Sequence, residues 1–250
     1  MRQLRREYID RFTDGINAIS EDARARLADA LASIDWTLDV AQVREAVVNV
    51  MQAYCSEATD VVAMLAAEFY DGLRAIELGE RMGALALSGR DPAATEGAVR
   101  AFAQLLVEGK REAFVARCSE RLDYECKVAA AQACMENARR DRRKPKFARV
   151  PAGGETCDFC LMLASRGFVY ASEQSASHAH ANCDCRVVPS WKSMGVQGYD
   201  PDALREQWRA TVDAKAEERA ERNGTDVDAE RRAIYRGYAQ SARNARKRRN

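Results

Sequence analysis

Cysteine and histidine residues gather in one stretch of this chain, residues 153–191. The stretch holds both histidines and four of the eight cysteines of the protein. Its spacing is Cys157-x2-Cys160, then nineteen residues, then His180-x2-Cys183-x-Cys185. Thiolate and imidazole are ligands that zinc prefers, and two pairs of them from separate turns can complete a tetrahedron. The spacing therefore predicts a zinc site.

The stretch offers more candidate ligands than a tetrahedral ion needs. We expect Cys157, Cys160 and His180 to bind the ion, together with either Cys183 or Cys185. Cys183 has the spacing typical of a zinc knuckle, and Cys185 falls on the same side of a predicted strand as Cys183. The sequence leaves the choice between these two cysteines open.

We expect the zinc to be structural. A catalytic zinc keeps one position open and needs a general acid or base nearby. Here protein side chains can fill all four positions, with His178 as a further candidate. The acidic residues of the stretch stand in no metalloprotease or deaminase pattern. The 44 residues 147–190 bury too little surface to fold alone, so zinc binding would supply the folding energy. Their expected minimal core is Phe159, Leu161, Leu163, Phe168, Val169 and Tyr170.

Two other kinds of chemistry fit this stretch less well. A redox C-x-x-C needs a βαβ context, which the sequence lacks, and it leaves the second group of ligands unexplained. A nucleophilic cysteine with His180 as its base has no third residue that the spacing singles out to orient the histidine. We therefore predict no catalytic residue.

The remaining cysteines have a different setting. Cys118, Cys126 and Cys134 recur every eight residues, and each step of eight turns about 80° around a helix, so they do not converge on one point. We expect them, with Cys55, to be small buried hydrophobic residues.

The elements that must position these residues are mainly helical. Apolar residues make up 47% of the chain, charged residues 31% and aromatic residues only 7%, which favours helices over sheets. We predict helices over residues 2–13, 20–34, 38–56 and 57–87, the last ending at Ser88-Gly89. Asp91-Pro92 caps a further helix that extends to about Arg143, with Gly109 as a bend or break. Its second half carries an apolar stripe: Phe114, Cys118, Leu122, Cys126, Ala129 and Ala133.

The pattern changes near Pro145 and again after Trp191. We predict a helical domain over 1–146, a Cys/His zinc module over 147–191 with short strands at 168–170 and 185–188, and a helical tail over 192–250. In the tail, Asp200-Pro201 caps one helix and Asn223-Gly224 ends it, after which Thr225-Asp226 can cap another. The fold class is therefore mainly α: an elongated helical region, a zinc-stapled module with a β-hairpin, and a helical tail.

Two segments are strongly basic. Residues 139–149 carry seven lysines or arginines in eleven positions, and residues 231–250 carry eight with no acid. Such segments can bind nucleic-acid phosphates or an acidic protein surface, or form a solvated helix end. The N-terminus lacks a signal peptide, and the longest apolar run is too short to span a bilayer, so we expect neither export nor a membrane anchor.

The residues 149–190 resemble a known family. The segment RVPAGGETCDFC, then a Gly-Phe-Val-Tyr stretch, then HANCDCR is similar to the shared segment of the Mu F-like minor capsid, or head morphogenesis, proteins of tailed bacteriophages. Carried over residue by residue, the C-x-x-C pair of the family corresponds to Cys157 and Cys160. The H-x-N-C-x-C set corresponds to His180, Cys183 and Cys185. This chain differs in having Ser177-His178-Ala179 where a proline is common, and C-D-C where C-R-C is common.

The resemblance implies a non-enzymatic virion component inside the head, made in the host cytoplasm during assembly. It would dock to the portal or the major capsid protein, aid head assembly, DNA packaging or ejection, and meet packaged DNA through 139–149 and 231–250. Some relatives carry a capsid-protease label, for which we find no nucleophile and base. The alternatives are a zinc-containing nuclease or hydrolase, for which two histidines are few, and a nucleic-acid-binding adaptor.

Overall fold

The computed structural model describes residues 3–153, 156–170, 185–192 and 195–247, without the side chains of 241–247. The fold is mainly helical, with one small two-stranded antiparallel sheet. The chain forms two compact units. One comprises residues 10–142, and the other joins residues 3–9 to the described residues from 143 onward. The division at 146 and 191 remains a prediction.

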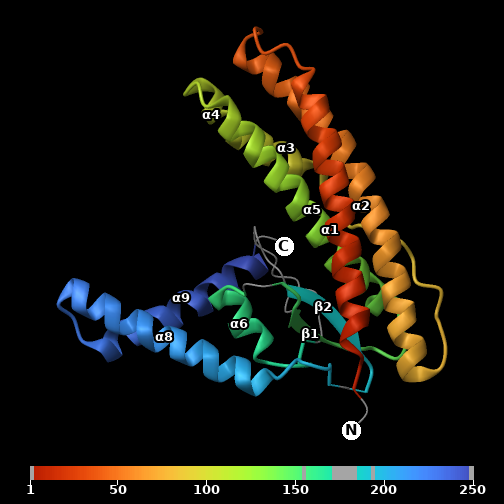
Figure 1. The fold of residues 1–250 in the computed structure, drawn as a ribbon, viewed down its shortest axis with the longest axis vertical. Helices are drawn as coiled ribbons and strands as arrows, with labels where there is room; N and C mark the ends of the chain where they lie inside the picture. Colours follow the sequence, from red (N-terminus) through yellow and green to blue (C-terminus); the bar gives the residue numbers. More distant parts are fainter. Residues whose placement is uncertain (1–2, 154–155, 171–184, 193–194, 248–250) are drawn as a thin grey trace. The chain divides into compact units, whose positions relative to one another are not determined.

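Long helices form the unit of residues 10–142 (Figure 1). In chain order they are α1 (Arg6–Ala32), α2 (Val40–Leu78), α3 (Pro92–Phe102), the short α4 (Gln104–Val107) and α5 (Arg111–Arg140). α2 packs along α5, and α3 contacts both. The Phe12 ring of α1 stacks on Phe69 of α2 with centroids 4.0 Å apart. At Gly15, an added Cβ would lie 2.7 Å from Leu65 Cδ2, so the absence of a side chain allows this close approach.

The helix boundaries differ from the prediction in the first half of the chain. Residues 40–78 form one helix where two were predicted, and α1 likewise runs unbroken through Gly15. α2 ends at Leu78, not at Ser88-Gly89, because Gly79 takes the left-handed conformation with φ 84° and caps the helix. A residue with a side chain would pay a steric cost there, so this glycine is the stronger stop signal.

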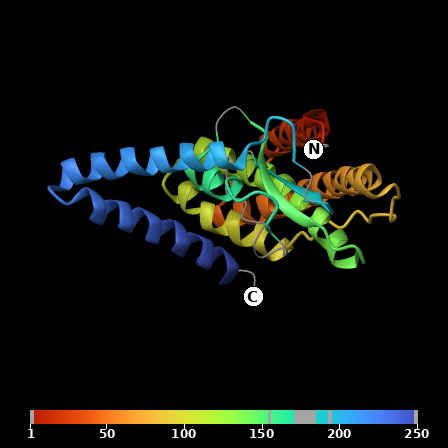
Figure 2. The ribbon, with the colours of Figure 1, turned by 90° about the horizontal axis from the view of Figure 1, so that it is seen from below.

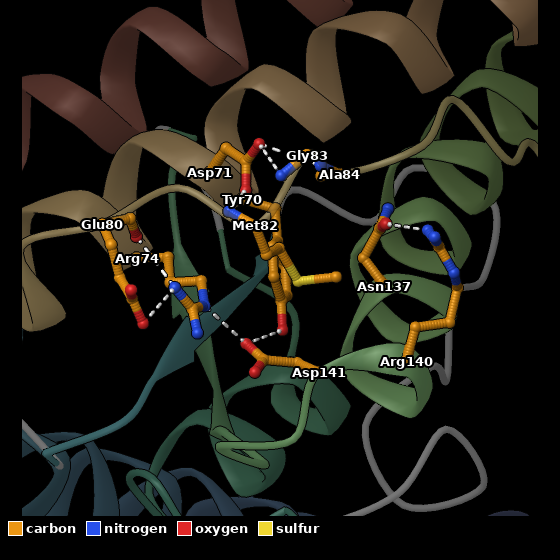
Figure 3. A network of polar contacts seen from close by, with 10 residues as sticks. All are labelled: Tyr70, Asp71, Arg74, Glu80, Met82, Gly83, Ala84, Asn137, Arg140 and Asp141. Atoms are coloured by element: carbon orange, nitrogen blue, oxygen red, sulfur yellow. Dashed lines mark hydrogen bonds and ion pairs between the residues drawn. The ribbon is translucent and has the colours of Figure 1, made fainter.

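A polar network fixes the segment after α2 in an extended path (Figure 3). The Asp71 carboxylate accepts hydrogen bonds of 2.8–3.1 Å from the backbone N–H groups of residues 82–84. The Asn137 side chain of α5 pairs with the backbone of Leu85, accepting from its N–H and donating to its C=O, both at 2.8 Å. Side chains on two helices thus take the place of a neighbouring strand.

Three predicted features of α3 to α5 are confirmed, although the helical path is also interrupted at Ala103 and ends at Arg140, short of the predicted Arg143. The Asp91 side chain caps α3 by accepting from the Ala93 N–H at 3.0 Å. The helical path breaks before Arg111, where Gly109 has φ 69°. The apolar stripe of α5 is buried against its neighbours.

The other unit contains the sheet. β1 (Lys146–Pro151) pairs with β2 (Cys185–Ser190), in a register that places Lys146 opposite Ser190 and Pro151 opposite Cys185. β2 confirms the strand predicted at 185–188, whereas β1 was not predicted. The strand predicted at 168–170 is wrong: Tyr170 forms only an isolated bridge with Phe147.

The first residues of the chain belong to this unit too. Leu4 forms a parallel bridge with Val196, donating from its N–H to Gly195 O at 2.8 Å. Arg6 donates to the Pro151 carbonyl at 2.8 Å. Because Leu4 takes part in a bridge, α1 begins at Arg6 and not at residue 2 as predicted.

Three helices complete this unit: α6 (Asp158–Ala164), α8 (Pro201–Asn223) and α9 (Val227–Lys247). α8 and α9 form an antiparallel helical hairpin (Figure 2). Its core is Val212, Ala216 and Ile234, against which Trp208 packs. Gly224, with φ 64°, ends α8, and the Asp226 side chain accepts from the Ala229 N–H, both as predicted. Among the described helices, none is both long and apolar enough to cross a membrane.

Candidate metal centre

The C-x-x-C pair lies at the start of α6. Cys157 is the residue that caps this helix, and its sulfur accepts a hydrogen bond from the Cys160 backbone N–H at 3.5 Å. The chain therefore turns tightly between the two cysteines, as the two-residue spacing predicted. Cys157 is exposed, whereas the Cys160 side chain is fully buried.

The second group of predicted ligands is described only at Cys185. This residue opens β2 and packs with Cys160 in one buried cluster, with 7% and 0% of their surfaces exposed. The two arms of the motif, 25 residues apart, thus meet at a pair of thiols. His178, His180 and Cys183 lie outside the described residues.

The side chains at this site are of a type that binds zinc. Three of the five candidate ligands are described, and all three are thiols, which zinc binds as thiolates. Within the described part of the chain, no group of three or more His, Cys, Asp or Glu residues could hold an ion by itself. A complete tetrahedron therefore needs ligands from the stretch that contains His180 and Cys183.

Three side chains from outside α6 hold the end of this helix. The last carbonyls of a helix lack partners within the helix. Here the Tyr170 hydroxyl donates to Leu163 O at 2.7 Å, and the Tyr199 hydroxyl to Ala164 O at 2.6 Å. Arg205 of α8 donates to Ser165 O at 3.0 Å. Burial raises the pKa of Tyr170 to about 12 and the pKa of Tyr199 further, so both hydroxyls remain donors near neutral pH.

The start of α6 is held by the helical hairpin. Asp158, the residue that follows Cys157, forms an ion pair with Lys215 of α8 and accepts a hydrogen bond from the Tyr238 hydroxyl of α9 at 3.1 Å. Burial, and then the charge of Asp158, raise the pKa of Tyr238. These contacts join the C-x-x-C turn to α8 and α9, so the cysteines sit on a short helix fixed at both ends.

The sequence analysis did not find the residues that fix α6. Tyr199, Arg205, Lys215 and Tyr238 lie 35 to 80 residues from their partners along the chain, and no local spacing marks them. The predicted minimal core is confirmed for Leu161, Leu163 and Tyr170, which are buried. It is wrong for Val169, which is 57% exposed.

The other cysteines are small buried residues, as predicted. Cys55, Cys118, Cys126 and Cys134 lie on α2 and α5 with no exposed surface. Burial raises the pKa of each thiol to about 12, so the reactive thiolate is scarce at neutral pH.

The basic segment 139–149 does not form one surface. Arg139 pairs with Glu136 at 2.6 Å, and Arg140 donates to Asn137 at 3.3 Å. Arg149 lies within β1 with 1% of its surface exposed. The residues that remain exposed between them are Arg142, Arg143, Lys144 and Lys146.

Comparison with known proteins gives two matches. The model of a family described as VG15 protein matches residues 3–211. The "Gene 15 protein" of Mycobacterium phage D29 is 31% identical over 131 residues, which cover 36% of this chain and 47% of that protein. The chain thus spans about half the length of the curated relative that it matches. No solved structure matches. The two matches indicate a phage protein family, whereas the finer Mu F-like assignment and the zinc motif stay predictions.

Proposed function

The chain belongs to the VG15 protein family, and from this premise we propose that it is a minor capsid, or head morphogenesis, protein of a tailed bacteriophage without enzymatic activity. The observation that carries the proposal is the packing of Cys160 against Cys185, which brings together the two arms of the segment that resembles the Mu F-like proteins. The similarity to a phage protein supports it independently.

The second part of the proposal is a structural zinc ion. Cys157 and Cys160 would bind it from the start of α6, and His180 with Cys185 or Cys183 would bind it from the other arm. Bound zinc supplies folding energy, with apparent values of about 10–16 kcal/mol in small zinc peptides. The residues around α6 orient the cysteine pair, so the ion would cross-link the start of α6 to the second arm of the motif.

Metal analysis tests the zinc proposal. We expect about one zinc per chain by elemental mass spectrometry, lost in Cys157→Ser and in Cys160→Ser. Comparing Cys185→Ser with Cys183→Ser identifies the fourth ligand, because only the true ligand is needed for tight binding. Zinc-free protein with the same near-ultraviolet circular dichroism and melting temperature as untreated protein would contradict the proposal.

The third part concerns location and partners. We propose that the protein resides inside the phage head, after assembly in the host cytoplasm, and docks to the portal or the major capsid protein. Its basic segments would contact packaged DNA. Mass spectrometry of gradient-purified virions, with a co-purification from cells that express the portal, tests this. Absence from virions and from portal complexes would refute it.

An assay for nuclease activity separates this proposal from the alternative of a zinc hydrolase. Purified protein is incubated with single- and double-stranded DNA plus magnesium or manganese. We expect intact DNA. Cleavage that disappears in His178→Ala, with the zinc content unchanged, would overturn the non-enzymatic proposal.

A further inference from the structure

We propose that the buried guanidinium of Arg149 stabilises the zinc-bound thiolates of Cys160 and Cys185 by balancing their negative charge. The inference rests on the proposed zinc site and deepens it, because it adds a residue that is not itself a ligand. Arg149 lies in β1, which pairs with the strand that Cys185 opens, and its side chain is 1% exposed.

The strand register places Arg149 and Cys185 on the same face of the sheet. Cys185 is paired with Pro151, and Arg149 is two residues before Pro151. Residues two apart on a strand point to the same face, as do residues directly opposite each other in an antiparallel pair. Diagonal neighbours of this kind lie about 7–8 Å apart, which is within reach of a long side chain. Arg149 and Cys185 are therefore neighbours on one face.

Helix α6 packs on this face. Cys160 of α6 lies with Cys185 in one buried cluster, and α6 contacts β1 directly. The Tyr170 hydroxyl, which donates to a carbonyl at the end of α6, relates Arg149 to the same place. Burial raises the pKa of Tyr170, the positive charge of Arg149 acts against this rise, and Cys185 adds to it. Arg149 and Cys185 thus both lie near this hydroxyl, between the sheet and α6.

Zinc bound by these cysteines would leave an excess of negative charge. The structure describes three candidate ligands, Cys157, Cys160 and Cys185, and each binds zinc as a thiolate. Three thiolates exceed the two positive charges of the ion by one. A neutral imidazole as the fourth ligand keeps this excess, and a fourth thiolate increases it. Because Cys160 and Cys185 are buried, a cation on the same buried face would lower the cost of holding this charge away from water.

Arg149 has the charge and the position that this site needs. Its guanidinium is always protonated near neutral pH and carries five N–H donors. Within the described strands β1 and β2, it is the buried cation on the face of Cys185. Arg186 is buried as well, at 4% exposure, but it is paired with Val150 and lies on the opposite face. The two arginines therefore differ in the face that they occupy.

The zinc affinity of the full chain tests the inference. The zinc dissociation constant is measured by competition with a chromophoric chelator, for the wild type, Arg149→Met and Arg149→Lys. We expect Arg149→Met to weaken zinc binding about 10- to 100-fold, the range typical of groups that support metal ligands. Arg149→Lys keeps the charge without the planar guanidinium, so its affinity should stay within about 5-fold of the wild type.

Arg186→Met is the matched control, since it removes a buried arginine of the same sheet from the opposite face. We expect it to change the zinc dissociation constant by less than about 3-fold. Wild-type affinity in Arg149→Met, an equal loss in Arg186→Met, or an equal loss in Arg149→Lys would each overturn the inference. If Arg149→Met does not fold, Arg149→Lys decides: affinity within about 5-fold of the wild type supports the charge balance, and a larger loss refutes it.

The wild type separates this inference from the proposed zinc site. Wild-type protein that binds zinc, with Arg149→Met binding it equally well, refutes the role of Arg149 and leaves the zinc site standing. Wild-type protein that binds no zinc refutes both.

Discussion

Replacing Asp141 with asparagine should destabilise the helical unit strongly. Asp141 is 2% exposed, and its Oδ2 accepts from Arg74 Nε at 2.9 Å and from the Tyr70 hydroxyl at 3.1 Å (Figure 3). The Arg74 side chain is itself only 7% exposed. The hydrogen bond to Asp141 raises the pKa of Arg74. Without the carboxylate the guanidinium still stays charged, because arginine is always protonated near neutral pH.

The magnitude follows from what the substitution leaves behind. Removing one partner of a buried ion pair typically costs about 3–5 kcal/mol, because the other charge remains buried. Arg74 keeps its contacts with Glu80, at 2.9 Å to the carbonyl and 3.2 Å to the exposed carboxylate, which offset part of the loss. We therefore expect Asp141→Asn to lower the free energy of unfolding by about 3 kcal/mol.

Urea unfolding followed by far-ultraviolet circular dichroism measures this effect. With an m value of about 2 kcal/mol/M, the midpoint should fall by about 1.5 M while m stays constant. Asp22→Asn is the matched control: Asp22 pairs with Arg26 at 3.0 Å on α1, but both side chains are exposed, so its effect should stay below about 0.5 kcal/mol.

A second variant tests whether an unpaired buried charge is the cause of the destabilisation. Arg74→Met/Asp141→Leu removes both charges, and burying apolar groups instead should destabilise less than Asp141→Asn does. If Asp141→Asn loses less than about 1 kcal/mol, or if the double variant is less stable than Asp141→Asn, an unpaired buried charge is not the cause.

Three further predictions concern other buried groups. Tyr199→Phe removes the donor to Ala164 O and should cost about 1–2 kcal/mol, measured as a lower melting temperature of the purified protein; an unchanged value would contradict the role of the hydroxyl. Asn137→Ala leaves both backbone groups of Leu85 without their side-chain partner, so proteolysis should begin in residues 79–91. A digestion rate like that of the wild type would show that Asn137 does not hold this segment. Burial raises the pKa of Cys134 from 9.0 to about 12. The thiol therefore ionises first in the unfolded chain, and the free energy of unfolding falls as pH rises from 9 to 12. The urea midpoint should drop less between about pH 8 and pH 10 in Cys134→Ala than in the wild type.

Local spacing was enough to predict much of the chain. Helix type follows from apolar periodicity, and caps such as Asp91-Pro92 and Asp200-Pro201 act on N–H groups two residues away. The tight turn between Cys157 and Cys160 is likewise local. These features depend on neighbours within one or two helical turns, so they are visible in any short window of sequence.

Sequence reasoning failed where a distant partner decides the outcome. β1 contains Lys146 and Arg149 within a basic run, and nothing nearby marks it as a strand. It forms because β2, 39 residues further on, satisfies its backbone hydrogen bonds. The same reason explains why α1 begins at Arg6, because Leu4 bonds to residues near Val196. The end of α2 at Leu78 is instead local, since Gly79 caps the helix in the left-handed conformation.

The sequence by itself determined the types of the candidate ligands, their spacing and the mainly helical class, because these are properties of short windows. Only the tertiary structure decided that Cys185 packs on Cys160 and that α8 and α9 hold the C-x-x-C turn through Asp158. It also decided which arginines lie buried or paired within the fold and which face solvent. Long-range contacts form only when the whole chain has folded, since each depends on burial and hydrogen bonding that remote segments supply together.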